Sequence, residues 1–461
     1  MNKNIILLTD SYKCSHYKQY PPKTQHVFSY FESRGGMFPE TVFFGLQYII
    51  KEYLLQPITK EWIDEAEELY TMHFGTKELF NRAGWEYILT KYDGKLPIRI
   101  KAVKEGTSVP THNVLMTVEN TDPNTYWLTN YLETLLSQVW YPSTVATLSR
   151  EMKKLILKYL ERTGDPNLIN FKLHDFGFRG VSSVESAGIG GAAHLVNFMG
   201  TDTVAALLLT KEYYKSGMTG FSIPAAEHST ITSWRQDGEV DAFRNMIQQF
   251  GNGSLYAVVS DSYDIYRACS NYWGTQLKDE VLAANGTLVV RPDSGIPNQV
   301  VVKCLELLGE KFGYSVNAKG FKVLNPKVRV IQGDGIDFEE TRKILNNMEL
   351  AGWSADNVAF GMGGGLLQKL NRDTQKFAFK CSSVTINGSQ VDVFKSPITD
   401  GGKKSKKGRL SLIKQGNSFV TVNYESDKSL LELVYENGNL VRDQLFDEVR
   451  AIAALEENKS K

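Results

Sequence analysis

The middle of the chain repeats one pattern of hydrophobic and polar positions. Short apolar or β-branched segments recur, and each one ends in a polar or glycine-containing cluster. These segments span residues 171–176, 197–202, 255–261, 287–293, 328–334 and 357–361, with 220–224 as a further candidate. Between them, residues 203–214, 300–312 and 337–351 have apolar side chains at helical spacing. Strands that alternate with helices form parallel sheets with right-handed crossovers. About seven such units within roughly 200 residues favour a (β/α) barrel over an open sheet.

The two ends of the chain have a different pattern. Before residue 165, strand patterns (4–9, 26–31, 96–101) mix with helical ones (60–74, 125–138, 148–162), and after residue 380 short strands and turns are expected. The sequence therefore predicts an α/β protein with an irregular (β/α) barrel at residues 166–380. Residues 1–165, completed by 381–461, are expected to form a companion α+β domain from both termini.

Composition and charge narrow the class of protein. Hydrophobic residues make up 42% of the chain and charged residues 23%, which is ordinary for a globular protein. Lys+Arg and Asp+Glu are equal at 52 each. The resulting zero net charge argues against bulk binding to nucleic acid or an anionic membrane, but not against a local site for a small anion.

Location is predicted from apolar runs and cysteines. No apolar run approaches the ~20 residues of a membrane span. The run Ile5–Leu8 is too short for a signal peptide and is expected to be a buried strand. Cys14, Cys269, Cys304 and Cys381 have neither metal-site nor disulfide spacing. Reduced thiols and a cytoplasmic location are therefore expected.

Acidic residues gather where the predicted barrel strands end. These ends carry glycines and the aspartates Asp175, Asp202, Asp261, Asp293 and Asp334. A single such aspartate would be a helix N-cap, whereas five at one rim of a barrel indicate a polar site. Separated acids without nearby His or Cys partners suit a hard cation such as Mg²⁺.

Two of the strand ends carry groups suited to phosphates and flat rings. In HDFGFRG, Phe176 could stack on an aromatic ring and Arg179 could pair with two phosphate oxygens; the alternative is a plain strand-to-helix turn with a core Phe. The glycines of Phe360–Leu366 permit close approach of the backbone to a phosphate ahead of a helix. Gln332–Gly335, one strand earlier, adds a flexible loop with a carboxylate.

Other rim residues leave two interpretations open. Arg291 can donate to a carbonyl, and Asp293 can accept from sugar hydroxyls or reach a metal through water. His228 follows the strand candidate 220–224. It is either a structural histidine or a nucleophile toward a phosphoryl group. The basic run 401–409 is either a solvated loop or an element that steers phosphates.

Together these motifs resemble those of the nicotinamide phosphoribosyltransferases. The resemblance runs nearly end to end. It rests on TDSYK (9–13), HDFGFRG (174–180), GTDT (200–203), PAAEHST (224–230), VVSDSYD (258–264), RPDSG (291–295), QGDG (332–335), FGMGGGLLQK (360–369) and SKKGRLSL (405–412). It implies a type II phosphoribosyltransferase of NAD salvage, which makes nicotinamide mononucleotide and pyrophosphate from nicotinamide and phosphoribosyl pyrophosphate. It also implies a homodimer with active sites at the subunit interface, Mg²⁺, and ATP hydrolysis coupled through phosphorylated His228.

The resemblance implies a role for each matching residue. Phe176 and Tyr12 of the partner subunit would sandwich the pyridine ring, and Asp202 would accept a hydrogen bond from the carboxamide. Arg291 would bind the carboxamide oxygen. Asp293 would hold ribose hydroxyls, and Asp261 would lie near His228 and the pyrophosphate or metal. The other substrate-binding residues implied are Asp10, Arg179, Gly333, Asp334, Gly363, Gly364 and Gly365, with Arg34, Arg372 and Lys380 of the partner subunit and a lysine of the run 403–407.

Departures from the family pattern affect some of these roles. Only Gly35–Pro39 follow Arg34, where vertebrate members carry a much longer basic loop. Phe178 and Phe221 replace tyrosines, which removes a hydroxyl at each point. Met362 replaces a serine in the glycine loop.

Asp202 decides between the two closest activities. A carboxylate accepts from an amide NH₂, whereas beside nicotinate it would face a like charge at a cost on the order of several kcal/mol. Nicotinamide is therefore expected, with nicotinate phosphoribosyltransferase as the alternative. A sugar-phosphate lyase or isomerase would need a catalytic Lys or Glu on the rim, and no clear candidate is present. A non-enzymatic protein that kept the fold would not need the complete set of His228, Asp293, Arg291 and Arg179.

Overall fold

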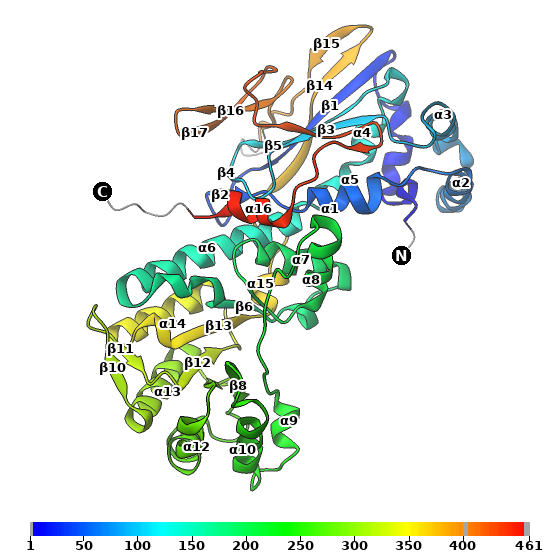
Figure 1. The fold of residues 1–461 in the computed structure, drawn as a ribbon. Coiled ribbons are helices and arrows are strands. Elements are labelled where there is room, and N and C mark those ends of the chain that lie inside the picture. The colour runs from blue at the N-terminus through cyan, green and yellow to red at the C-terminus, as the bar shows by residue number, and fades with distance from the viewer. Residues whose placement is uncertain (1–2, 400–403, 456–461) are drawn as a thin grey trace. The chain divides into compact units, whose positions relative to one another are not determined.

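The computed structural model describes residues 3–399 and 404–455, and the contacts within the chain divide it into two units (Figure 1). The first unit contains Met1–Thr147, Glu212–Ser216 and Asn371–Ala454, and the second contains Leu148–Lys211 and Gly217–Leu370. The sequence-based domain boundaries after residues 165 and 380 remain predictions, because a compact unit is not by itself an independently folding domain.

The second unit is built on a parallel sheet of six strands. Their order is β7-β6-β13-β12-β9-β8. The strands are β6 (Leu173–Asp175), β7 (Gly200–Thr201), β8 (Leu255–Val259), β9 (Thr287–Arg291), β12 (Val328–Gln332) and β13 (Val358–Met362). Each overlaps a segment that the hydrophobic pattern marks as a strand. The predicted alternation of parallel strands and helices is therefore confirmed.

The segment between residues 220 and 226 joins the two edges of this sheet. Phe221 forms a parallel bridge with Gly200 of β7, and Ala225 forms one with Ala257 of β8. The amide of Ala257 donates to the carbonyl of Pro224 at 2.8 Å. The amide of Ala226 donates back to the carbonyl of Ala257 at 2.9 Å. This segment matches the seventh strand candidate, and it completes an irregular (β/α) barrel.

Apolar side chains from neighbouring strands pack inside the barrel. Ala257, Val289 and Ile331 form a buried cluster, against which Phe176 and Ile223 pack. The helices of this part of the chain are α6 (Trp140–Thr163), α7 (Val184–Leu195), α8 (Val204–Tyr214), α9 (His228–Thr232), α10 (Glu239–Phe250), α11 (Ile265–Arg267), α12 (Lys278–Ala283), α13 (Pro297–Phe312), α14 (Phe338–Leu350) and α15 (Gly364–Leu367). Figure 1 shows α13 and α14 beside the sheet, and α13 contacts both β12 and α14. A short hairpin of β10 (Tyr314–Val316) and β11 (Lys322–Leu324) follows α13.

The first unit is built on an antiparallel sheet that both ends of the chain supply. Its order is β15-β14-β1-β5-β3-β18-β19. The strands are β1 (Thr24–Ser33), β3 (Ile98–Ala102), β5 (Val114–Asn120), β14 (Phe377–Ile386), β15 (Ser389–Asp392), β18 (Glu432–Glu436) and β19 (Asn439–Leu440). Because β1 pairs with β14 and β3 with β18, the predicted companion fold from both termini is confirmed.

Smaller elements surround this sheet. Two further strand pairs are β2 (Glu40–Val42) with β4 (Ser108–Pro110) and β16 (Ser411–Gln415) with β17 (Ser418–Val422). The helices are α1 (Leu46–Ile49), α2 (Lys60–Phe74), α3 (Arg82–Tyr92), α4 (Leu128–Tyr131), α5 (Glu133–Ser137) and α16 (Phe446–Ala453). Within residues 3–399 and 404–455, no helix is long and apolar enough to cross a membrane.

Two elements of the first unit differ from the prediction. The predicted strand at 4–9 is a short 3₁₀ turn, Ile5–Leu7, in which the Asn4 side chain accepts the amide of Ile6 at 3.1 Å. Ile5 and Ile6 are fully buried, so the apolar run predicted burial correctly, but so short a run does not distinguish a strand from a buried turn. The predicted helix at 125–138 is broken into the two short helices α4 and α5. Within α4, the side-chain hydroxyl of Thr129 donates to the Val27 carbonyl of β1.

Candidate active site

The carboxyl ends of the barrel strands surround a cavity of about 750 Å³. It is lined by Phe176, Phe178, Arg179, Asp202, Thr203, Glu227, His228, Ser229, Arg291, Asp293, Gly333, Asp334 and Gly363. Each of these residues lies at the end of a barrel strand or just after it. In parallel barrels this is the face that carries the chemistry.

Most of the predicted site residues of the second unit meet in this cavity. Those that line it are Phe176, Arg179, Asp202, His228, Arg291, Asp293, Gly333, Asp334 and Gly363. Asp261 contacts one of them directly, and Gly364 and Gly365 continue from Gly363 into α15. Sequence reasoning missed Phe178, Thr203, Glu227 and Ser229 as lining residues. Each is the immediate neighbour of a predicted residue, and that adjacency was the available signal.

His228 lies between two aspartates. Its Nε2 is 3.0 Å from Asp261 Oδ1, and its Nδ1 is 4.0 Å from Asp293 Oδ2. Because a carboxylate can only accept, Nε2–H donates to Asp261. In the neutral imidazole, Nδ1 then carries the lone pair. The catalytic residues predicted from the sequence therefore form one contiguous group.

Asp293 has an environment suited to a cation. Burial raises the pKa of its carboxyl group, the nearby charges of Asp261 and Asp334 raise it further, and Arg291 and His228 oppose the shift. Arg291 Nε lies 3.4 Å from Asp293 Oδ1. These carboxylates are hard oxygen donors, which fit a hydrated Mg²⁺ ion carried by phosphates. In the described part of the chain, no three His, Cys, Asp or Glu side chains form a direct metal cluster.

Phe176 and Asp202 lie on different strand ends of the same cavity. The Phe176 ring lies against the backbone of Gly361 and beside Gly333. The Asp202 carboxylate is exposed, and its Oδ1 accepts a hydrogen bond from the Ser222 hydroxyl. A flat ring that lay on Phe176 would therefore share the cavity with a carboxylate acceptor.

Asp175 lies beneath these two residues. Its Oδ1 accepts the amide of Gly177 at 2.7 Å, and its backbone carbonyl accepts the amide of Asp202 at 3.0 Å. Burial raises the pKa of Asp175 to about 6, with a smaller contribution from the charge of Asp202, while the Gly177 amide and the Thr203 hydroxyl oppose the shift. Asp175 thus links the HDFGFRG and GTDT motifs.

The remaining predicted residues belong to the first unit. Asp10 precedes the 3₁₀ segment Ser11–Lys18, and its Oδ2 accepts the Thr134 hydroxyl at 2.7 Å. Tyr12, in the same segment, is 59% exposed. The neighbouring Lys13 pairs with Glu133 at 2.8 Å. Tyr12 is thus held on an anchored segment with much of its side chain exposed.

A basic cluster, defined as Arg34, Arg372, Lys380 and Lys395, lies in the same unit. Burial lowers the pKa of Lys380, the charges of the other three lower it further, and Glu133 opposes them. Among the described atoms, the buried Nε of Arg34 has no hydrogen-bond partner. Such a cluster suits an anionic ligand. Lys395 was missed because it follows β15 and belongs to no recognised motif.

The predicted basic run is partly engaged elsewhere. The side chain of Lys406 forms an ion pair with the buried carboxylate of Glu32. Its backbone amide donates to the Tyr30 hydroxyl at 2.9 Å. Residues 401–403 lie outside the described part of the chain. A phosphate-binding role for a lysine of this run therefore stays a prediction.

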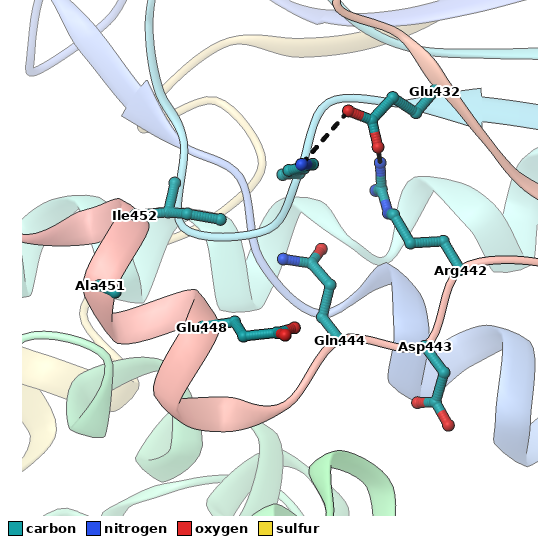
Figure 2. Close-up of a pocket in the computed structure, with 8 residues that line it drawn as sticks. Glu432, Arg442, Asp443, Gln444, Glu448, Ala451 and Ile452 are labelled. Carbon is teal, nitrogen blue, oxygen red and sulfur yellow. Dashed lines mark hydrogen bonds and ion pairs between the residues drawn. The ribbon is translucent and has the colours of Figure 1, made fainter.

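A second cavity, of about 440 Å³, lies in the first unit (Figure 2). It is lined by Lys104, Glu432, Arg442, Asp443, Gln444, Glu448, Ala451 and Ile452. Figure 2 shows Glu432 directed toward Arg442, at 3.4 Å. Arg442 also donates to the carbonyls of Ala102 and Val103. These charged groups bond to the protein itself, so the barrel cavity is the candidate active site.

The sequence matches two family models and several curated proteins. The Nicotinate phosphoribosyltransferase (NAPRTase) family matches residues 171–439, and the N-terminal domain of nicotinamide phosphoribosyltransferase matches residues 4–100. A nicotinamide phosphoribosyltransferase from Xanthomonas campestris pv. campestris is 55% identical over 463 residues, covering 98% of each chain. Another from Acinetobacter baylyi is 33% identical, covering 97% of this chain and 96% of the relative.

Solved structures show the same fold at low sequence identity. The nicotinate-nucleotide pyrophosphorylase of Pyrococcus furiosus aligns with a TM-score of 0.62 at 15% identity, covering 98% of this chain and 95% of that one. Human nicotinic acid phosphoribosyltransferase aligns with a TM-score of 0.54 at 16% identity, covering 97% and 93%. Both alignments extend over the barrel and the companion fold.

Proposed function

The chain belongs to the nicotinate phosphoribosyltransferase family, and we propose that within it the protein acts as a nicotinamide phosphoribosyltransferase in NAD salvage. It would transfer the phosphoribosyl group of phosphoribosyl pyrophosphate to nicotinamide and release pyrophosphate. The observation that carries this proposal is the cavity that the Phe176 ring and the Asp202 carboxylate line together. The relatives named for the same activity, at 55% and 33% identity, support it.

Recognition of the base rests on a ring and a charge. The pyridine ring would stack between Phe176 and Tyr12 of the partner subunit. The Ser222 hydroxyl engages Asp202 Oδ1, so Oδ2 is the oxygen for the carboxamide NH₂. Arg291 would donate to the carboxamide oxygen. Nicotinate would place its carboxylate against Asp202, which disfavours it.

The reaction is a displacement at the anomeric carbon of ribose. The pyridine nitrogen forms the new C–N bond as the bond to the pyrophosphate oxygen breaks, and positive charge develops on the ribose. Asp293 would accept from the ribose hydroxyls, and Arg179 with the amides of the glycine loop would hold the phosphate. Bound through phosphate oxygens near Asp261 and Asp293, Mg²⁺ would supply charge neutralisation for the departing pyrophosphate.

ATP would act through His228. Nδ1 is the nitrogen that Asp261 leaves with a lone pair, so it would attack the γ-phosphorus of ATP; the N–P bond forms, the P–O bond breaks and ADP leaves. Asp261 would stabilise the charge on the phosphorylated ring. The His228→Ala variant is expected to keep basal turnover and lose its stimulation by ATP. Full ATP stimulation in this variant would exclude the phosphohistidine.

The assembly and location complete the proposal. We infer a homodimer in which the barrel of one subunit is completed by Asp10, Arg34, Arg372 and Lys380 of the partner subunit. The unsatisfied Nε of Arg34 and the exposed ring of Tyr12 support this inference. A cytoplasmic location is supported by the four cysteines, all of them free thiols.

One assay tests the proposed activity. Product formation from phosphoribosyl pyrophosphate and Mg²⁺ is measured with nicotinamide or nicotinate, each with and without ATP. Selective formation of nicotinamide mononucleotide, stimulated by ATP, is expected. A preference for nicotinate would overturn the role of Asp202, and the absence of product from either base would overturn the proposed function.

A further inference from the structure

Gly361 occupies the place where the Phe176 ring meets the barrel wall. It lies in β13, two residues after Ala359, which packs against the interior cluster. Alternate residues of a strand face the same side, so a side chain at 361 would also point inward. A Cβ built there would lie 2.0 Å from Cε2 and 2.2 Å from Cδ2 of Phe176. The ring therefore fills the space that any side chain at 361 would need.

The ring has little freedom to move away from β13. Its edge lies beside Gly333, where a Cβ would be 3.3 Å from Cε2, and its inner side packs against the buried cluster of the barrel. Its backbone amide donates to the carbonyl of Met362 at 3.1 Å. A side chain at 361 would push the ring toward the cavity, the side from which the base must approach.

We propose that Gly361 is a positioning residue, which sets the depth of the Phe176 ring and thereby the position of the bound base. The base must lie on this ring and also reach Asp202, which follows the neighbouring strand β7 and whose backbone amide donates to the carbonyl of Asp175 in β6. A displaced ring would make the two contacts incompatible. Which base is bound rests on the proposed function. That the binding of the base depends on the position of the Phe176 ring does not rest on it.

The test is a double-mutant cycle. The Gly361→Ala variant is expected to raise the KM for nicotinamide about tenfold, the size of a lost stacking contact, with the KM for phosphoribosyl pyrophosphate changed less than about twofold. In a Phe176→Ala background, where no ring remains to be displaced, Gly361→Ala is expected to have no further effect on the nicotinamide KM. Equal fold-changes in both backgrounds would overturn the proposal.

Gly217→Ala is the matched control. A Cβ at Gly217 would meet nothing within 4 Å, and neither Gly217 nor Gly361 has the left-handed backbone that favours glycine. The two variants therefore make the same Gly→Ala change, with a clash against Phe176 at position 361 and without any clash at position 217. Gly217→Ala is expected to retain the wild-type KM values. A rise in the nicotinamide KM equal to that of Gly361→Ala would contradict a role specific to position 361.

Two further outcomes are separable. If Gly361→Ala alone fails to fold, the double variant Phe176→Leu/Gly361→Ala, which has room for the methyl group, is compared with Phe176→Leu. An equal nicotinamide KM in these two variants supports the proposal. A further large rise of this KM in the double variant overturns it. Should the wild-type enzyme prefer nicotinate, the proposed function fails. The cycle is then run with nicotinate, and the same criteria decide the role of Gly361.

Discussion

Asp175 and Asp202 end neighbouring strands, yet their carboxyl groups have opposite surroundings. Asp202 is exposed to the cavity, where it can accept from a substrate, whereas Asp175 is fully buried and bonds to Gly177. Two residues of one chemical type thus have different surroundings: in the proposed function Asp202 would select the base, whereas Asp175 bonds to the two loops that carry Phe176 and Asp202.

Removing the charge of Asp202 should change which base is used. In the Asp202→Asn variant, the repulsion of nicotinate is lost and the amide becomes a possible donor to its carboxylate. The ratio of kcat/KM for nicotinamide to that for nicotinate is expected to fall at least about tenfold. Asp241→Asn, the same change at an exposed position of α10, should leave the ratio unchanged. An unaltered ratio in Asp202→Asn would contradict the role of this carboxylate.

The pH dependence of stability between about pH 4 and pH 6 should include a contribution from Asp175. Its pKa rises from 3.8 to about 6 on folding, so between these pH values the folded state holds a proton that the unfolded state has lost. Wild-type stability relative to the Asp175→Asn variant should therefore fall as the pH rises toward 6, by at most about 1.4 kcal/mol per pH unit, and then level off.

Urea unfolding of both proteins at a series of pH values measures this difference. Because all other titrating groups are shared, the difference in unfolding free energy isolates the group at position 175. A difference that stays flat across the window, or that favours the wild type increasingly as the pH rises, would contradict the raised pKa.

At the scale of elements, a buried lysine joins the strand starts opposite the cavity. Lys172 precedes β6, and its Nζ donates to the carbonyls of Ala355, Asp356 and Val358 at 2.9–3.0 Å. These carbonyls surround the start of β13. One side chain therefore fixes the relative position of the two strands that, at their other ends, carry Phe176 and Gly361.

The Lys172→Met variant is expected to lose stability but not catalytic efficiency. It removes one donor from each of three carbonyls, of which that of Ala355 keeps the amide of Val358, at a cost of about 3 kcal/mol in unfolding free energy. The kcat/KM at a temperature where the variant is folded should stay near wild type, because Lys172 lies at the end of the barrel away from the cavity. Lys343→Met, at an exposed position of α14, serves as the control in urea unfolding. A large loss of kcat/KM in folded Lys172→Met would contradict this division.

The elements differ in how far the sequence could predict them. The barrel strands were predictable because each is a short apolar run that ends in Asp or Gly, and their parallel order brings those ends together. The turn at Ile5–Leu7 was not predictable, because a short apolar run is found both in strands and in buried turns. Lys395 and Gly361 were also beyond prediction. Lys395 joins the other residues of the basic cluster only through chain folding. Gly361 is important because it has no side chain, which leaves space for the Phe176 ring.

At the scale of the whole molecule, the predicted site residues form two groups, one in each unit of the chain. His228, Asp202 and Phe176 belong to the barrel, whereas Tyr12 and the basic cluster belong to the first unit. The proposed homodimer accounts for this division by completing each barrel cavity with residues of the partner subunit.

Mixing two variants that each lack ATP-stimulated turnover tests the dimer. With shared sites, a heterodimer of His228→Ala and Arg372→Ala subunits carries both changes in one site and none in the other. Random reassembly of equal amounts should therefore restore ATP-stimulated turnover to about a quarter of the wild-type level. Each variant reassembled alone is the control. No recovery, with heterodimers demonstrated by differential tagging, would show that each site is built within one chain.

The pairing of β3 with β18, in which Ala102 faces Glu432, has a consequence for how the protein is made. The ribosome releases β1, β3 and β5 early, but their sheet is completed only when the last strands emerge, after the entire barrel has been synthesised. A premature stop codon just before Glu432 would leave every barrel residue intact and one edge of β3 unpaired. Such a nascent chain would carry an exposed strand edge, which templates aggregation, so its fate would be decided by chaperones and proteases rather than by its catalytic residues.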